Sequence, residues 1–248
     1  MRRILLALLP LLLSACAAAP DSPPRPTSSA TQVEWQRVAP GCQGDDCAYV
    51  RADYPRYPGQ PELDRAVREA LAGLAVDVGE TNTASASPEA YATRFLAIAA
   101  RVGADDPRWA SELSARELRR TSSLVVLELD AYVFTGGAHG MPTTRYLVFD
   151  LRDQRALGLD DLLLPDRREA FEQLAREAHA DWARQQFPDD PDFTEQWEFS
   201  LTDNVAPLTD GLTLKYDVYA IAPYSEGQPE LVIPYSRLDG ILDPRWLQ

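Results

Sequence analysis

Basic residues, histidine and cysteine are scarce in this chain, and each shortage argues against a class of function. The 248 residues carry 24 Lys and Arg against 38 Asp and Glu, a formal net charge of −14. Nucleic-acid phosphates would meet net repulsion, so broad nucleic-acid binding is excluded. The two histidines and three cysteines do not form a paired zinc-ligand motif, so carboxylates would have to supply most of the ligands at any metal site. We therefore expect no metal and no cofactor.

The chain also lacks the signatures of common hydrolases and phosphate-binding enzymes. It contains no G-x-S-x-G nucleophile elbow. The glycine-rich stretch at residues 136–140 has no predicted helix after it and no lysine at the Walker position, so a phosphate loop is disfavoured. Paired acids such as Asp45 and Asp46, or Asp105 and Asp106, arise by chance among 38 carboxylates. No reaction follows from these residues, and a non-catalytic role is favoured without excluding an enzyme.

The N-terminal apolar run is too short to cross a bilayer. Arg2 and Arg3 precede Ile4 to Leu13, a stretch interrupted only by Pro10. A positively charged start and a short apolar segment are typical of a secretory signal peptide, here residues 1–15.

The sequence Leu-Ser-Ala-Cys that follows resembles a bacterial lipobox. It predicts cleavage after Ala15 and acylation of Cys16, which would hold the protein on a membrane. The alternative is an ordinary signal peptide cut between Ala15 and Ala19. Ala17, in place of aspartate, resembles the sorting pattern of outer-membrane lipoproteins in Gram-negative bacteria. We expect an outer-membrane lipoprotein that faces the periplasm, with the inner membrane as the less favoured location.

A tether and a disulfide are expected next. Residues 16–31 are small, polar and proline-rich, so they cannot bury enough apolar surface to fold and predict a disordered tether. Without residues 1–15 and their two arginines the net charge becomes −16. In an oxidising periplasm Cys42 and Cys47 predict a local disulfide. A zinc pair is disfavoured, because no second Cys or His pair completes the ligands.

The remaining apolar periodicity predicts an α+β fold. A strand begins at Ala48, a helix at Pro61, and a second helix at Pro88 with Ser87 as its N-cap. The later predicted elements are strands at 111–120, 124–134 and 144–151, a helix at 165–186, two strands within 205–222, a strand at 231–233 and a short helix at Pro234. Helices grouped between runs of strands favour antiparallel sheets covered by three longer helices.

The most conspicuous motif is Gly136-Gly137-Ala138-His139-Gly140. Its glycines permit positive φ, so the loop could present His139 to a ligand or to a proton transfer. The alternative, which we favour, is a tight connection in which the imidazole bonds backbone. The second histidine, His179, lies beside the apolar stripe of the third helix and forms no metal-binding pair with His139.

Residues 188–198 are acidic and carry no basic group. The first interpretation is an anionic platform in which Phe193 and Trp197 are exposed anchors for a cationic partner. The second is a solvated loop whose carboxylates suit a helix N-terminus. The residues do not decide between them.

The stretch DAYVFTGGAHGMPTTRYLVFDL, with the later LKYDVYAIAPYSEGQPELVIPYSRLDGIL, resembles the sensor domain of RsiV-type anti-sigma factors. Residues 32–120 resemble the companion domain of PdaC-type peptidoglycan deacetylases, and 121–248 form the RsiV-like part. The chain has neither the anti-sigma segment nor the deacetylase domain, so those activities are not implied. The positions that match the motif well are Gly136, Gly137, His139, Tyr219, Pro223 and Tyr224.

The resemblance implies a non-catalytic binding module. We expect a lipid-anchored protein of the cell envelope that recognises a cationic, lysozyme-like protein or a peptidoglycan-associated ligand. The candidate ligand-binding residues are Gly136, Gly137, His139, Tyr219, Tyr224, Phe193 and Trp197. The alternative is a cell-wall hydrolase or deacetylase-like enzyme that uses His139 as acid or base.

Overall fold

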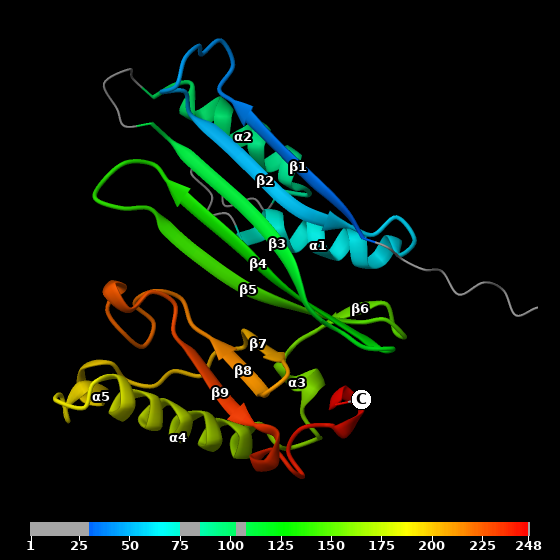
Figure 1. Cartoon of the computed structure of the whole chain (residues 1–248), viewed down its shortest axis with the longest axis vertical. Helices are drawn as coiled ribbons and strands as arrows, with labels where there is room; N and C mark the ends of the chain where they lie inside the picture. The colour runs from blue at the N-terminus through cyan, green and yellow to red at the C-terminus, as the bar shows by residue number, and fades with distance from the viewer. Residues whose placement is uncertain (1–29, 75–84, 103–107, 248) are drawn as a thin grey trace, which may run out of the picture.

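A six-stranded sheet forms the larger part of the structure (Figure 1). The structure is a computed structural model, and it describes residues 30–74, 85–102 and 108–247. The strands lie in chain order: β1 (Thr31–Val38), β2 (Tyr49–Arg56), β3 (Ala110–Arg120), β4 (Leu124–Phe134), β5 (Met141–Asp150) and β6 (Arg155–Leu157). Only β2 and β3 are parallel neighbours. They are parallel because the chain between them passes through α1 (Pro61–Leu74) and α2 (Pro88–Ala99), a crossover of the kind that parallel pairing needs.

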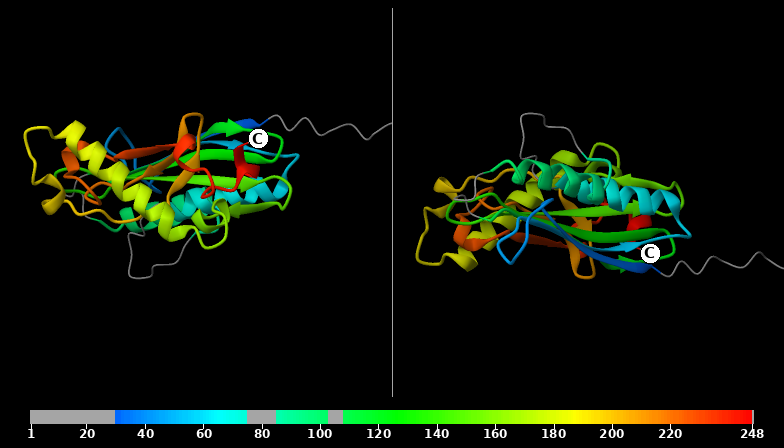
Figure 2. Two further views of the ribbon diagram at one scale, coloured as in Figure 1. Left: turned by 90° about the horizontal axis from the view of Figure 1, so that it is seen from below. Right: turned by 90° about the horizontal axis from the view of Figure 1, so that it is seen from above.

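Both of these helices cover the same face of the sheet (Figure 2). In each helix the apolar residues recur every three or four positions, which gives one apolar face, as in an amphipathic helix. The first hydrophobic core therefore lies between α1, α2 and alternate residues of β2 to β5, including Leu63, Val67, Leu71, Tyr91, Phe95, Val125, Leu127 and Leu129. Along most of β1 to β4 the opposite face of the sheet carries polar and charged side chains.

A second layer is built by the C-terminal part of the chain. It contains α3 (Leu159–Leu162), α4 (Arg168–Gln186), α5 (Phe193–Gln196), a three-stranded antiparallel sheet of β7 (Val205–Pro207), β8 (Gly211–Lys215) and β9 (Glu230–Pro234), and 3-10 turns η1 (Tyr224–Glu226), η2 (Tyr235–Arg237) and η3 (Pro244–Leu247). Its core includes Phe171, Leu214 and Ile233 together with Leu124 and Val126 of β4. Strand β4 therefore supplies both cores, one from each face.

The side chain of Asn204 closes part of the edge of β5. Strand β6 pairs only with residues 148–150 of β5. Beyond that point, Tyr146 N donates to Asn204 Oδ1 over 2.8 Å, and Asn204 Nδ2 donates to the carbonyl oxygen of Thr144 over 2.8 Å. Asn204 Nδ2 also lies 3.3 Å from the carbonyl oxygen of Lys215 in β8. One buried amide thus replaces a strand at this edge and joins the two sheets.

The structure confirms the predicted α+β class and several element boundaries. Ser87 caps α2, because its Oγ accepts a hydrogen bond from Ala90 N over 3.2 Å. The third long helix begins at Arg168, not at Pro165, since Asp166 has a left-handed φ of 59° that a helix cannot pass through. Residues 235–237 form a 3-10 turn in place of the predicted short helix. Strand β1, which starts where the predicted tether ends, was not predicted.

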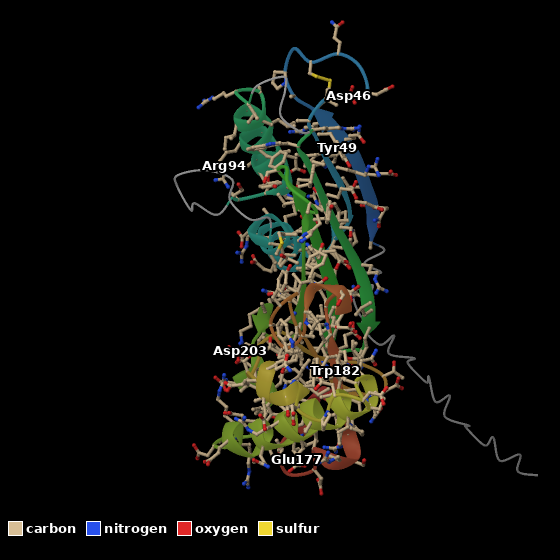
Figure 3. All side chains as sticks on the ribbon, turned by 90° about the vertical axis from the view of Figure 1, so that its left-hand side faces the viewer. Asp46, Tyr49, Arg94, Glu177, Trp182 and Asp203 are labelled. Carbon is tan, nitrogen blue, oxygen red and sulfur yellow. A yellow bond between two sulfur atoms is a disulfide. The ribbon has the colours of Figure 1, made fainter. Side chains whose placement is uncertain are left out.

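The predicted disulfide is present between Cys42 and Cys47, in the loop that joins β1 to β2 near Asp46 (Figure 3). Cys16, the signal peptide, nearly all of the tether and the pair Asp105 and Asp106 lie outside the described residues. No described helix has the length and apolar character to cross a membrane. Strands β3 and β4, on the two sides of the predicted domain boundary at 120/121, are paired neighbours in one sheet.

Candidate functional site

The β4–β5 connection is a compact loop in which several positions accept only glycine. Gly136 and Gly137 have φ values of 108° and 95°, in the region that disfavours side chains. At Gly140 the constraint is close contact, since a Cβ there would lie 2.4 Å from Cζ of Tyr132. Gly140 N also donates to the Tyr132 hydroxyl over 3.2 Å. The loop is therefore packed down on β4.

Aromatic side chains from two distant segments meet at this loop. The His139 ring stacks on Tyr224, with centroids 3.9 Å apart and planes 25° apart. The Tyr224 hydroxyl donates to the carbonyl oxygen of Gly140 over 2.9 Å, and the Tyr219 ring lies 5.5 Å from that of Tyr224. We call Tyr132, His139, Tyr219 and Tyr224 the aromatic end. Tyr219 is 50% exposed and Tyr132 38% exposed, although large hydrophobic side chains usually lie inside.

The segment 216–229 that carries two of these rings is anchored to β5. Arg145 makes a bidentate ion pair with Asp217, with N–O distances of 2.7 and 2.6 Å. Thr144 Oγ1 lies 2.9 Å from Gln228 Oε1 and 2.6 Å from Asp130 Oδ1. Bidentate arginine pairs restrict orientation as well as distance. The segment that carries Tyr219 and Tyr224 is therefore held in place before any ligand binds.

Tyr219 has a φ of 66°, which is uncommon for a residue other than glycine, asparagine or aspartate. Such backbone conformations cost about 1 kcal/mol or more and concentrate at functional sites. The strained backbone places the Tyr219 ring at the surface, where it takes no part in the second core. This combination marks Tyr219 as the leading candidate of the aromatic end.

Carboxylates lie beside the aromatic end on the face of the sheet opposite α1 and α2. Glu112 of β3 is the register partner of Tyr132 and accepts a hydrogen bond from the Tyr49 hydroxyl over 2.8 Å. Asp130 is two residues before Tyr132 on the same face of β4. This arrangement can combine aromatic contact with attraction for cations. Among the described residues no group of three or more His, Cys, Asp or Glu side chains is placed to hold a metal ion.

The structure brings together most, but not all, of the predicted ligand-binding residues. Gly136, Gly137, His139, Tyr219 and Tyr224 meet at the aromatic end. Phe193 and Trp197 belong to a separate small cluster. Tyr132 was not predicted, although its signal was present, because the alternation of β4 places it on the same face as Glu128 and Asp130.

The prediction of exposed aromatic anchors is wrong for Phe193. Its ring stacks on Phe187 with centroids 3.8 Å apart and is only 5% exposed, because it covers Ala183 at the end of α4. Trp197 is half-buried against the same cluster. The acids around them, Asp189, Asp190, Asp192, Glu195 and Glu198, are exposed as the anionic interpretation requires. This segment therefore offers charge without aromatic anchors.

His139 has contacts that suit a structural or binding role. Its Nδ1 lies 3.1 Å from the carbonyl oxygen of Gly140, which can only accept, so Nδ1 is the donor of this hydrogen bond. In the described part of the chain no carboxylate is hydrogen-bonded to the imidazole. General acid–base histidines are commonly oriented by such a group.

The other histidine, His179, is buried in α4 and is 2% exposed. Its ring lies 5.9 Å from that of Phe199, and Nε2 has no hydrogen-bond partner among the described residues. Burial lowers the pKa of His179 and the charge of Arg176 lowers it further, whereas a hydrogen bond with the Ile221 backbone acts in the opposite direction. His179 is therefore a neutral core residue, outside the aromatic end.

We expect His179 to make the fold sensitive to mild acid. Its folded-state pKa is lowered below the usual value of about 6.5, so the unfolded chain binds a proton that the folded chain does not. Stability should be unaffected by this group above that pH and should fall below it, with a slope of at most about 1.4 kcal/mol per pH unit. Urea unfolding of wild type and His179→Gln from pH 7 to 5 measures this. Equal slopes for the two proteins would contradict the assignment.

The chain is similar in sequence and structure to known proteins. Residues 160–236 match the family described as "Protein of unknown function (DUF3298)". A DUF3298 family protein from Pseudomonas aeruginosa PAO1, known as a crystal structure, is 38% identical, with 88% of this chain and 95% of that chain covered and a TM-score of 0.77. A family member from Bacteroides fragilis NCTC 9343 is 23% identical, with 88% and 94% covered and a TM-score of 0.62, and shows the same fold. No curated protein matches the chain.

Proposed function

The chain belongs to the DUF3298 family, and from that premise we propose that it is a lipid-anchored envelope protein whose aromatic end docks a cationic protein of the lysozyme type, without catalysis. One observation carries the proposal. The exposed rings of Tyr132, His139 and Tyr219 are positioned by backbone contacts and by Tyr224, and are left out of both cores.

Exposed tyrosines on a rigid base have the properties of a protein-binding hot spot. Tyrosine is enriched at such positions because it buries a large area at a small cost in side-chain entropy. The Arg145–Asp217 pair and the loop glycines hold the rings before a partner arrives, which lowers the cost of ordering them on binding. These features support the aromatic end as the docking surface.

The charge of the chain favours a cationic partner. The net charge is −14, and the carboxylates of Glu112 and Asp130 lie beside Tyr132. The exposed acids at residues 189–198 flank Phe193, which packs with Ala222 of the segment that carries Tyr219 and Tyr224, so they add to the negative field near that segment. Opposite charges steer association and raise its rate, whereas like charges suppress other partners. Lysozyme-type proteins are strongly cationic, so their charge complements this surface.

Two sequence features support the envelope location and the partner class. The lipobox at Cys16 implies acylation, and the Cys42–Cys47 disulfide suits an oxidising compartment. The motif residues that resemble RsiV-type sensor domains are those that gather at the aromatic end. The alternative of an enzyme that uses His139 receives less support, because the imidazole contacts a carbonyl oxygen and a tyrosine ring.

Titration of hen lysozyme into the purified protein tests this function. We expect saturable binding at about 50 mM salt and an affinity at least several-fold lower at about 300 mM, because added salt screens charges on the surface. Equal affinities at the two salt concentrations would contradict charge-steered docking. Binding of peptidoglycan fragments without any response to lysozyme would contradict the proposed partner class.

A further inference from the structure

Strand β1 ends the six-stranded sheet and leaves one edge unpaired by any described strand. Ala39 N donates to the carbonyl oxygen of Ala48, and the unbroken register then directs the backbone groups of residues 31, 33, 35 and 37 toward β2. The backbone N–H and C=O groups of Gln32, Glu34, Gln36 and Val38 therefore face outward. Figure 1 shows β1 at the margin of the sheet.

This edge lacks several of the devices that usually prevent strands from pairing. Natural sheets protect their edges with proline, charged side chains and above all lysine, bulges or very short strands. Strand β1 is eight residues long, contains neither Pro nor Lys, and pairs with β2 without a bulge. Its charged residues are Glu34 and Arg37, one of each sign. Six of its eight residues are exposed, and Val38 is 47% exposed. The edge is therefore a template for another strand.

We propose that a second copy of this chain pairs with it, β1 against β1, antiparallel and centred on Trp35. In that register Glu34 of each copy lies opposite Gln36 of the other. Both residues direct their backbone groups outward, so they form a hydrogen-bonded pair, and their side chains share the exposed face of the sheet. The Gln36 amide can then donate to the Glu34 carboxylate, twice per dimer.

Neighbouring registers are less complementary. A register centred on Glu34 places two carboxylates directly opposite each other, which is destabilising. A register centred on Gln36 places Glu34 opposite Val38, where it finds no donor side chain. A shift by a single residue sets outward groups against inward groups and removes the ladder. The register centred on Val33 also sets Glu34 opposite a glutamine, Gln32, but it has one kind of hydrogen-bonded pair where the register centred on Trp35 has two, 34/36 and 32/38. The register centred on Trp35 is therefore the longer of the two that give Glu34 a donor.

The same register covers apolar surface. Trp35 is half-buried on the helix side, with the Arg37 guanidinium 4.9 Å from its ring centroid. Pairing brings the two Trp35 side chains across from each other, as a non-hydrogen-bonded pair with close side chains. Val38 comes opposite Gln32, whose stem can pack on it. A second copy thus complements both faces of the edge.

Sedimentation equilibrium of the purified full chain in density-matched detergent tests the pairing. We expect a reversible monomer–dimer equilibrium. Gln36→Lys should tighten it and Gln36→Glu should weaken it, each about threefold or more, because two cross-strand charge pairs change together. Gln36→Pro should abolish the dimer, since it removes an outward N–H and leaves the β1–β2 ladder intact. Gln36→Ala, which keeps the N–H, is its matched control.

Circular dichroism melts of the Pro and Ala variants show whether the fold survives each substitution. A wild-type protein that stays monomeric up to about 500 µM, a range that covers weak specific complexes, would overturn the proposal. A dimer that none of the Gln36 variants changes would place the interface elsewhere and overturn it too. Weakening by both the Lys and the Glu variant would overturn the register.

Discussion

Asn204→Ala is expected to lower the free energy of unfolding by about 2 kcal/mol. The substitution removes the partner of Tyr146 N–H and one of the two donors to the Thr144 carbonyl, which keeps a hydrogen bond from Arg145 Nη1 over 2.8 Å. A buried polar group left without a partner costs about 1–3 kcal/mol. The site is closed to water, since Asn204 is 8% exposed and Thr144 3%. The loss should also loosen the contact between the two sheets.

Urea unfolding measures this cost, and the neighbouring residue provides a matched control. Asp203 makes an ion pair with Arg168 over 2.8 Å, but its side chain is 71% exposed. Exposed ion pairs contribute about 0–1 kcal/mol, so Asp203→Ala should change stability little. If both alanine variants cost the same, the side chain of Asn204 does not replace a strand.

Local signals in the sequence predicted most of the architecture because they act over few residues. The stripe of α1, the Ser87 cap of α2 and the alternation of β4 each depend on spacing within one element. The disulfide followed from two nearby cysteines and the expected compartment. The candidate loop at residues 136–140 was predicted because glycines so close together are typical of a loop whose backbone has positive φ.

The features that were missed depend on contacts between distant segments. Strand β1 turns only Val33 and Trp35 toward the core, so its alternation is weak, and its pairing with β2 is the stronger determinant. Phe193 follows an acidic stretch that is typical of an exposed loop, yet Phe187 and Ala183 bury it. Asn204 stands in an ordinary turn sequence, and its role exists only once β5 has been placed beside it.

Tyr219→Gly is expected to weaken lysozyme binding at least about 30-fold, which corresponds to a hot-spot loss of about 2 kcal/mol. The reason is the removal of a ring that is 50% exposed on the proposed docking surface. Stability should be nearly unchanged. Glycine adopts the φ of 66° without strain, and this gain offsets the greater freedom of the unfolded chain.

Val232→Ala is the matched control, because Val232 is 45% exposed on β9 and lies outside the aromatic end. It should bind lysozyme as wild type does. Thermal melts of both variants separate loss of contact from loss of fold.

Titration of hen lysozyme into wild type and Tyr219→Gly at one low salt concentration tests most directly whether the aromatic end docks a cationic protein. We expect saturable binding to wild type and a loss of affinity of about 30-fold or more in a variant that melts at the same temperature. Equal affinity of the two proteins, or no binding to wild type, would contradict this docking.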